Sequence, residues 1–193
     1  MSQTVGKKWI KDYFDLYQKA LFEKDVSEEL LRLKELFEKA HRAGKKIIFV
    51  GNGGSSAMSS HCAVDFTKNA RIRCVNFNEA DLITCFANDF GYEHCFQKAL
   101  EYYADDGDVV VLISSGGRSP NILSAAQYAL TRKLFLVTLT GFSSDNPLAS
   151  LGHMNLCVSS RAYNVIENVH QIWLLTVCDM IIGKAEYPAK PEV

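Results

Sequence analysis

The sequence has almost no excess of charge of either sign. Lys and Arg together number 21 and Asp and Glu number 22, for a formal net charge of -1. A chain so balanced has no net field to hold polyanionic nucleic acid or an anionic membrane surface, so we expect neither as a partner. Only four prolines and twelve glycines are present, which is unlike a disordered or collagen-like chain and predicts a folded protein.

The sequence also lacks the marks of an exported or membrane-spanning protein. Its six cysteines are scattered without a C-x-x-C pair, which is typical of reduced thiols rather than a disulfide framework. Residues 1–8 are polar and do not resemble a signal peptide. The longest apolar runs, such as 109–113 and 172–175, fall far below the roughly 20 residues needed to cross a bilayer. These features predict a soluble cytoplasmic protein.

The amino-terminal quarter carries apolar residues spaced by three and four, which predicts two helices between residues 5 and 43. A break near residues 25–27 separates them, with Ser27 as the expected N-cap of the second helix and Gly44 after its end. No internal repeat or linker follows. We therefore expect a single domain over residues 1–193, in which residues 1–44 form an N-terminal helical extension.

From residue 46 onward, short β-branched runs alternate with amphipathic segments. The expected strands are 46–50, 72–77, 109–113, 134–139 and 154–158, and the expected helices are 55–68, 79–87, 92–103, 120–131, 146–151 and 162–182. Alternation of this kind is typical of a parallel sheet covered by helices. The predicted fold class is therefore α/β, with a five-stranded parallel sheet flanked by helices and preceded by the helical pair.

The first candidate site is a glycine-rich turn between a strand and a helix, Gly51-Asn52-Gly53-Gly54-Ser55-Ser56. Ligands of parallel sheets bind at the carboxyl ends of the strands, where glycines let backbone N–H groups approach an anion. The turn has neither the Gly-Lys-Ser/Thr ending of a phosphate-binding loop of nucleotide hydrolases nor the G-x-G-x-x-G spacing of dinucleotide folds. It is a candidate phosphate or sugar site, although a purely structural turn is the alternative.

The second candidate site is the segment from Ser114 to Asn121, which again follows a strand and opens a helix. Three hydroxyls, two glycines and a helix N-terminus converge there, an arrangement that holds a phosphate monoester without a metal. The alternative is that Ser119 only caps the helix, with Pro120 at its first position. Capping uses one hydroxyl and leaves Ser114 and Ser115 unexplained, so phosphate binding is favoured.

Together with other segments, these loops resemble the SIS (sugar isomerase) domains, and within them the phosphoheptose isomerase group. The shared segments, in chain order, are Gly51 to Ser55, His61, Asn88-Asp89-Phe90-Gly91, the loop from Ser114 to Asn121, Leu139-Thr140-Gly141, and Ile166-Glu167-Asn168-Val169-His170. The resemblance implies a flavodoxin-like sandwich, a homotetramer with sites between subunits, and a phosphorylated sugar as ligand. The implied reaction converts sedoheptulose 7-phosphate to a manno-heptose 7-phosphate through an enediol.

The resemblance also assigns substrate-binding residues. The phosphate would be held by the loop that contains Ser114, Ser115, Ser119 and Asn121, in which Gly116 replaces a serine of the family. The sugar side of the pocket would be lined by Asn52, Gly53 and Ser55, with Asp89 near the substrate.

The catalytic residues match the family less completely. The family has a His and a Glu four residues apart on the helix after the glycine turn, and here the pair is His61 and Asp65, whose carboxylate is one methylene shorter. On the last helix, Glu167 stands where the family has Gln, and Leu175 stands where it has a catalytic His. The resemblance therefore implies Asp65 as the proton-transfer group, with His61 and Glu167 positioning the substrate or a metal.

Some members of the group bind zinc, and His61, Asp65 and Glu167 form a suitable ligand set if the family geometry holds. The alternative is that Asp65 and Glu167 accept hydrogen bonds from His61, Lys68 or Arg161. His170 is expected to be packed or at a subunit interface rather than to act as a ligand. Because Leu175 replaces the family histidine, the rival function is a catalytically inactive sugar-phosphate-binding or protein-interaction module of the replication-initiator-binding type.

Overall fold

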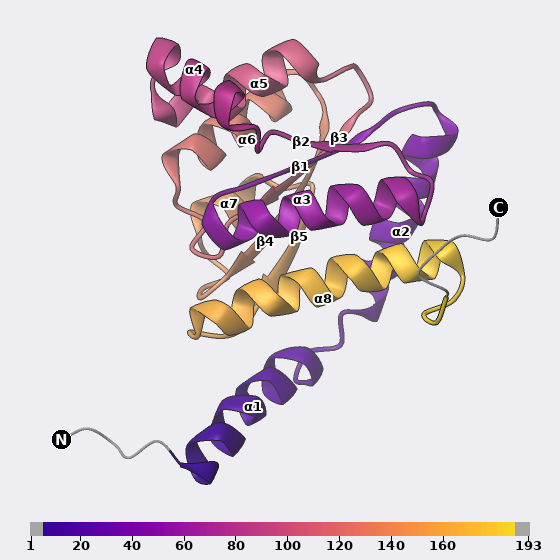
Figure 1. Ribbon diagram of the computed structural model, residues 1–193, viewed down its shortest axis with the longest axis vertical. Helices are drawn as coiled ribbons and strands as arrows, with labels where there is room; N and C mark the ends of the chain where they lie inside the picture. The colour runs from indigo at the N-terminus through magenta and orange to yellow at the C-terminus, as the bar shows by residue number, and fades with distance from the viewer. Residues whose placement is uncertain (1–5, 188–193) are drawn as a thin grey trace.

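The computed structural model describes residues 6–187 and contains a five-stranded sheet with helices on both faces (Figure 1). The elements in chain order are α1 (Lys7–Phe22), α2 (Ser27–Arg42), β1 (Ile47–Gly51), α3 (Gly53–Lys68), β2 (Cys74–Asn76), α4 (Ala80–Phe90), the 3-10 turn η1 (Tyr92–His94), α5 (Cys95–Tyr103), β3 (Val109–Ile113), α6 (Pro120–Thr131), β4 (Phe135–Gly141), α7 (Pro147–Leu151), β5 (Met154–Val158) and α8 (Tyr163–Ile182). The predicted α/β fold class is confirmed.

All strand pairs are parallel, in the order β2-β1-β3-β4-β5. The register aligns Gly51, at the end of β1, with Ile113, at the end of β3. Strands 1 and 3 are therefore neighbours that end at the same level, and the loops that follow them lie next to each other. This arrangement brings two loops to one edge of the sheet. They are the glycine turn (residues 51–56) and the serine loop (residues 114–121).

The sheet is buried on both faces because its strands are apolar at nearly every position. Alternate residues of β1 point to opposite sides: Phe49 packs with Phe37 of α2 and Phe66 of α3, whereas Val50 packs on the α5 and α6 side. The first face is covered by α2, α3 and α8. Figure 1 shows α3 and α8 side by side across this face, where they also contact each other.

Two expectations about local structure are corrected. The strand expected over residues 72–77 is shorter: Arg71 has a left-handed conformation, and the Ile72 N–H donates to Phe66 O at the end of α3, so pairing with β1 begins at Cys74. Ser27 is not an N-cap, because α2 begins at Ser27 itself and the carboxylate of Asp25 accepts the Ser27 N–H at 2.9 Å.

Helix α1 stands apart from the sheet (Figure 1). None of its residues is buried, and Trp9, Ile10, Phe14 and Phe22 are all exposed apolar side chains. Its contacts are with α8, where Asn168 Nδ2 donates to Tyr17 OH at 2.8 Å. An apolar helix without a cover of its own is typical of a surface that another chain completes.

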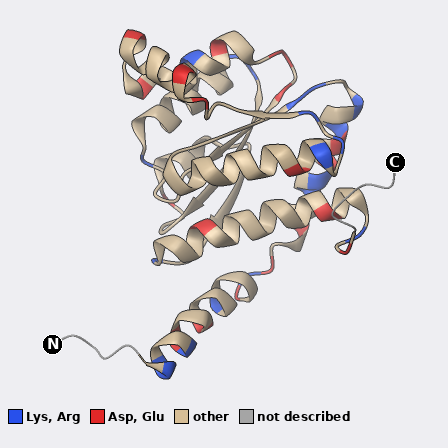
Figure 2. Cartoon of the chain, in the orientation of Figure 1, with Lys and Arg blue, Asp and Glu red and all other residues tan. Residues whose placement is uncertain are grey.

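Charged residues of both signs are spread over the outer helices and connecting loops, and the strands are nearly free of them (Figure 2). Within the described residues, one helix, α8, is long and apolar enough to span a membrane by length and composition. Its residues Val165, Val169, Trp173 and Val177 belong to the core against the sheet and α2, which explains its hydropathy in a folded domain.

Candidate active site

The glycine turn after β1 is shaped by close packing. A Cβ at Gly51 would lie 2.6 Å from Ser55 Cβ, so a side chain is excluded there, and Gly53 has a φ of +54°, which favours glycine. Helix α3 begins at Gly53, with exposed Gly53 and Gly54 in its first turn and Ser55 buried directly behind them. The backbone N–H groups at this helix end therefore face open space, as an anion or sugar hydroxyl requires.

The serine loop after β3 is fixed to the neighbouring strand by its backbone. The Ser114 N–H donates to Leu139 O at 3.0 Å, and the Gly141 N–H donates to Ser115 O at 2.8 Å. Both Ser114 and Ser115 are buried, and Ser115 Oγ has no hydrogen-bond partner within the described residues. A buried hydroxyl without a partner is costly unless a ligand or water satisfies it.

Ser119 occupies the N-cap position of α6 with Pro120 at the first helical position, as the sequence predicted. Its side chain makes no capping hydrogen bond, however. The alternative in which Ser119 serves only as a cap therefore has no support in the geometry. The hydroxyl lies at the N-terminus of a twelve-residue helix, where the helix dipole favours negative charge.

The two loops are joined by a reciprocal pair of side-chain amides. Asn52 Nδ2 donates to Asn121 Oδ1 and Asn121 Nδ2 donates to Asn52 Oδ1, both at 2.9 Å. Tyr92 OH donates to Asn52 Oδ1 at 3.0 Å, which ties η1 to the same point. Tyr92 was not among the residues predicted from the sequence. It directly follows the segment from Asn88 to Gly91, which was predicted, and this position was the available signal.

Asp89 is the predicted substrate residue that the structure leaves apart from the loops. It is exposed on α4, where its carboxylate accepts hydrogen bonds from Asn88 Nδ2 at 2.9 Å and from Cys85 Sγ at 3.8 Å. Among the described residues, none of its hydrogen bonds reaches the glycine turn or the serine loop. Its assignment to the substrate stays a prediction.

Glu167 lies against the start of α3. A Cβ on Gly54 would overlap the Glu167 carboxylate, which shows how closely the two helices approach at this level. Burial raises the pKa of the Glu167 carboxyl above its ordinary value, because desolvation disfavours the charged form. Glu167 is therefore next to the glycine turn, with a pKa higher than that of an exposed glutamate.

The overlap at Gly54 gives a direct test of the position of Glu167. We expect Gly54→Ala to push the carboxylate away and to lower kcat/KM by about tenfold to hundredfold, because small displacements of a reacting group are costly. Steady-state kinetics measure the loss of activity, and a thermal melt measures any change in stability separately. A Gly54→Ala protein with an unchanged melting temperature and full activity would show that catalysis does not use Glu167 at this position.

His61 and Asp65 form a pair on α3, one turn apart and half-exposed. His61 Nε2 lies 3.2 Å from Asp65 Oδ2, and His61 Nδ1 accepts a 2.7 Å hydrogen bond from Gln171 Nε2 of α8. Leu175, one turn further along α8, packs against the core. The structure therefore brings His61 and Asp65 together, as predicted, and adds Gln171, which the sequence did not single out.

The predicted zinc set is not assembled within one chain. Within residues 6–187, no group of three or more His, Cys, Asp or Glu side chains is placed to hold a metal ion. The reason is that α3 and α8 run side by side in the same direction, so Glu167 meets Gly54 while His61 lies seven residues, or about 10 Å, further along α3. Within one chain these residues do not form a three-ligand zinc site, and the zinc expected from the resemblance stays a prediction.

His170 is packed in the core, as the sequence favoured. It is fully buried, its Nε2 donates to Thr140 O at 2.8 Å, and its Nδ1 has no partner among the described residues. Burial lowers its pKa from 6.5 to about 4. The neutral ring is thus part of the folded structure and not a member of the site.

This pKa predicts a loss of stability in acid. Because the folded-state pKa lies below the unfolded value, the unfolded chain takes up the proton first, and stability present above pH 6.5 is lost as the pH falls toward 4, by about 3 kcal/mol in total. Urea unfolding at several pH values measures this loss. His170→Gln is expected to have a shallower slope between these pH values, and an identical slope would contradict the assignment.

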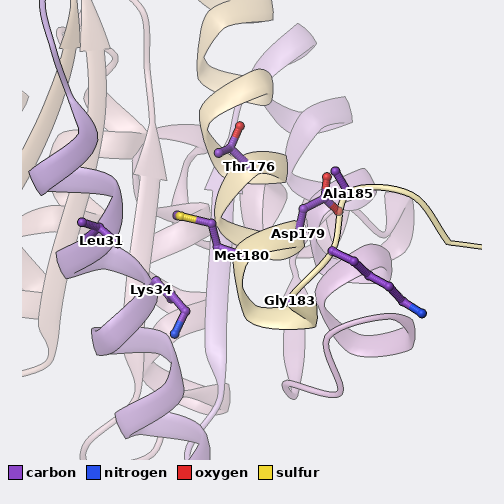
Figure 3. A pocket seen from close by; sticks show the side chains of 8 residues that line it. Leu31, Lys34, Thr176, Asp179, Met180, Gly183 and Ala185 are labelled. Atoms are coloured by element: carbon purple, nitrogen blue, oxygen red, sulfur yellow. The ribbon is translucent and has the colours of Figure 1, made fainter.

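A groove of about 540 Å³ lies between α2 and the end of α8 (Figure 3). The groove is lined by Leu31 and Lys34 of α2 and by Thr176, Asp179 and Met180 of α8, and Figure 3 shows Met180 directed toward α2 and Asp179 on the side of Ala185. Asp179 is twelve residues beyond Glu167 on the same helix, a separation of about 18 Å. The groove is therefore distinct from the loops at the carboxyl edge of the sheet.

The parallel sheet, the glycine turn and the serine loop at the ends of adjacent strands define the class of protein. The SIS domain family matches residues 12–141, more than half of the chain, and the chain is a SIS domain protein. The match agrees with the resemblance to SIS domains that the sequence showed.

Comparison with individual proteins narrows the class. The chain is 30% identical over 186 residues to a phosphoheptose isomerase of Maridesulfovibrio salexigens, covering 88% of this chain and 86% of that protein. It is 28% identical over 169 residues to a phosphoheptose isomerase of Fusobacterium nucleatum, covering 85% and 87%. A solved phosphoheptose isomerase structure from Neisseria gonorrhoeae matches with a TM-score of 0.82 and 28% identity over 90% of this chain and 95% of that one. The chain belongs to the phosphoheptose isomerase family.

Proposed function

We propose that the protein is an aldose–ketose isomerase that converts sedoheptulose 7-phosphate to a manno-heptose 7-phosphate. The observation that carries the proposal is the serine loop at the N-terminus of α6, which holds a buried Ser115 hydroxyl without a partner beside the glycine turn. The relatives named above are phosphoheptose isomerases, which supports the same substrate. The replacement of the family histidine by Leu175 is the feature behind the alternative of an inactive binding module, and the relatives named above give that alternative no support.

Phosphate recognition follows from the geometry of the serine loop. The dianion accepts hydrogen bonds from the hydroxyls of Ser114, Ser115 and Ser119 and from N–H groups at the start of α6. The amide pair of Asn52 and Asn121 holds this loop against the glycine turn, so the sugar extends toward Gly53 and Ser55. Binding therefore requires no excess of positive charge, in agreement with the net charge of -1.

The reaction moves protons between neighbouring carbons. In the forward direction a base takes a proton from C1 of the ketose while the C2 carbonyl oxygen gains a proton, which gives the enediol. A proton then returns to C2 while the C1 hydroxyl loses its proton, which gives the aldose. General acid and base groups within hydrogen-bond reach of these atoms supply the rate enhancement.

Asp65 suits the role of the general base, and Glu167 suits the role of the general acid. The Asp65 carboxylate, oriented by the His61 N–H, acts as the base at carbon. Burial raises the pKa of Glu167, which favours its protonated form relative to an exposed glutamate, so we assign it the role of the acid at the carbonyl oxygen. Glu167 thereby supplies the proton-transfer group that Leu175 cannot.

The two groups lie at different levels along α3. Glu167 is beside Gly54, and Asp65 lies eleven residues further along α3, or about 16 Å. An active site that uses both therefore combines the loops and Glu167 of one subunit with Asp65 and His61 of another. We accordingly propose a homotetramer with shared sites, in which the exposed apolar face of α1 is covered by a neighbouring chain.

The setting that suits this reaction is the cytoplasm. All six cysteines are free, and burial raises the pKa of the Cys62 thiol to about 12, so it stays protonated and unreactive. Zinc stays a prediction of the resemblance, to be decided by adding the ion to the purified protein.

The experiment that tests the proposed function follows the conversion of sedoheptulose 7-phosphate to an aldoheptose phosphate, with ligand binding measured on the same preparation. Turnover supports the isomerase. Binding of the sugar phosphate without turnover over several hours would overturn it and favour the inactive module.

A further inference from the structure

Gln171 is a polar residue of α8 that contacts the His61–Asp65 pair and that the proposed reaction leaves without a role. Its Nε2 lies 2.7 Å from His61 Nδ1, a contact between residues 110 apart in sequence. On the other side of the ring, His61 Nε2 lies 3.2 Å from Asp65 Oδ2. The imidazole is therefore held at both nitrogens, once from each helix.

The hydrogen-bonding properties of Gln171 and Asp65 determine which nitrogen of the His61 ring carries the proton. An amide nitrogen can only donate a hydrogen bond, so His61 Nδ1 accepts and carries no proton. The ring proton is then on Nε2, directed at Asp65 Oδ2, where a carboxylate accepts it. The opposite tautomer would place two acceptors against each other at Asp65 and two donors against each other at Gln171.

Gln171 contacts His61 from α8, whereas two other side chains near it on α8 pack in or against the core. His170 is turned into the core, where its Nε2 donates to Thr140 O. Leu175, one turn after Gln171, is apolar and packs against the core. Gln171 is half-buried between α3 and α8, which restricts its side chain to the contact with His61.

We propose that Gln171 is a positioning residue, which holds His61 in the Nε2–H tautomer and so orients the Asp65 carboxylate for proton transfer. This inference rests on the proposed isomerase function. The hydrogen bond from His61 occupies Asp65 Oδ2 and leaves Oδ1 available to take the proton from the sugar. Gln171 itself touches neither the substrate nor the transferred proton.

The tautomer is measured by nitrogen-15 NMR of protein labelled at its five histidines, with His61→Asn to assign the His61 signals. At about pH 8.5, where an ordinary imidazole is neutral, we expect the Nε2–H form of His61 in the native protein. Gln171→Leu removes the donor, and we expect a mixture of tautomers. Gln171→Glu places an acceptor opposite Nδ1, and we expect Nδ1 to carry a proton.

Kinetics provide the second readout. Both variants are expected to lower kcat about fivefold to tenfold, the worth of one hydrogen bond, with little change in KM because Gln171 does not contact the substrate. The matched control is Gln127→Leu, at an exposed position of α6 far from the pair, which is expected to keep the native kcat and the native His61 signals.

The outcomes separate this inference from the proposed function. A native protein without turnover of sedoheptulose 7-phosphate overturns the isomerase assignment. An active native protein whose Gln171 variants keep the native kcat, or keep the native His61 spectrum, overturns the positioning role alone. A native His61 in the Nδ1–H form also overturns it.

Discussion

Asp65→Asn is expected to lower kcat/KM for sedoheptulose 7-phosphate by about 10² to 10⁴, the usual contribution of a general base. The amide has nearly the same shape as the carboxylate and still accepts from His61 Nε2, but it cannot take a proton from carbon. Phosphate binding by the serine loop is expected to be unaffected. Steady-state kinetics and isothermal titration with the sugar phosphate measure the two properties on the same sample.

Two controls make this result specific. Asp106→Asn changes an exposed carboxylate that pairs with Arg132, and we expect native activity. If sites are shared between subunits, mixing unfolded Asp65→Asn and Glu167→Gln chains and refolding them together restores part of the activity, because some sites then receive both native carboxylates. An Asp65→Asn protein within a factor of two of native activity would remove Asp65 from the mechanism.

Asp108→Ala is expected to reduce the free energy of unfolding by about 3–5 kcal/mol, the largest stability effect that we expect of a single change. Asp108 is fully buried at the start of β3, where it accepts from Lys46 N at 3.0 Å and from Asp105 N at 2.8 Å. Lys46 Nζ lies 2.5 Å from Asp108 Oδ2 and 2.7 Å from Asp105 Oδ2. Removal of the carboxylate leaves two backbone donors and part of a buried ammonium without an acceptor.

Urea unfolding at neutral pH measures this loss, and Asp106→Ala on the exposed pair with Arg132 is the matched control, with no measurable change expected. Because Asp108 lies at the amino edge of the sheet, opposite the serine loop, the folded fraction of Asp108→Ala is expected to keep its affinity for the sugar phosphate. A change in unfolding free energy no larger than that of the control would show that the buried ion pair is not needed for stability.

The order of strands and helices follows from the sequence because the periodicity is strong and local. The strand at 109–113 is apolar throughout and is flanked by turns, so its bounds are those predicted. The strand before α4 is shorter than predicted because Arg71 turns the chain in a left-handed conformation, which no hydropathy pattern shows. The expected cap at Ser27 is absent because α2 already begins at Ser27, whose N–H donates to the Asp25 carboxylate.

The two loops of the site were also predictable from the residues, because glycines and serines stand directly after strands and before helices. The structure adds what holds the loops together, the amide pair of Asn52 and Asn121. These residues are 69 apart, and only the pairing of β1 with β3 brings them within reach. Local patterns therefore located the loops but not the bond between them.

The arrangement of the catalytic residues depends on how two distant helices pack. The site predicted for His61, Asp65 and Glu167 depended on the family geometry, with sites between subunits, which no local pattern in the sequence fixes. The contacts of Gly54 with Glu167 and of His61 with Gln171 show that α8 runs alongside α3 in the same direction. This direction places Glu167 and Asp65 at different levels of α3, and among the described residues no group of three or more His, Cys, Asp or Glu side chains is placed to hold a metal ion.

The central claim is that this chain transfers a proton between C1 and C2 of a sugar phosphate. The most direct measurement is proton NMR of sedoheptulose 7-phosphate with the protein in D₂O, with and without added zinc. We predict an aldoheptose 7-phosphate that carries deuterium at C2, formed by Asp65→Asn at a rate lower by about 10² to 10⁴. Bound sugar phosphate with neither product nor deuterium exchange, in either condition, would contradict the account.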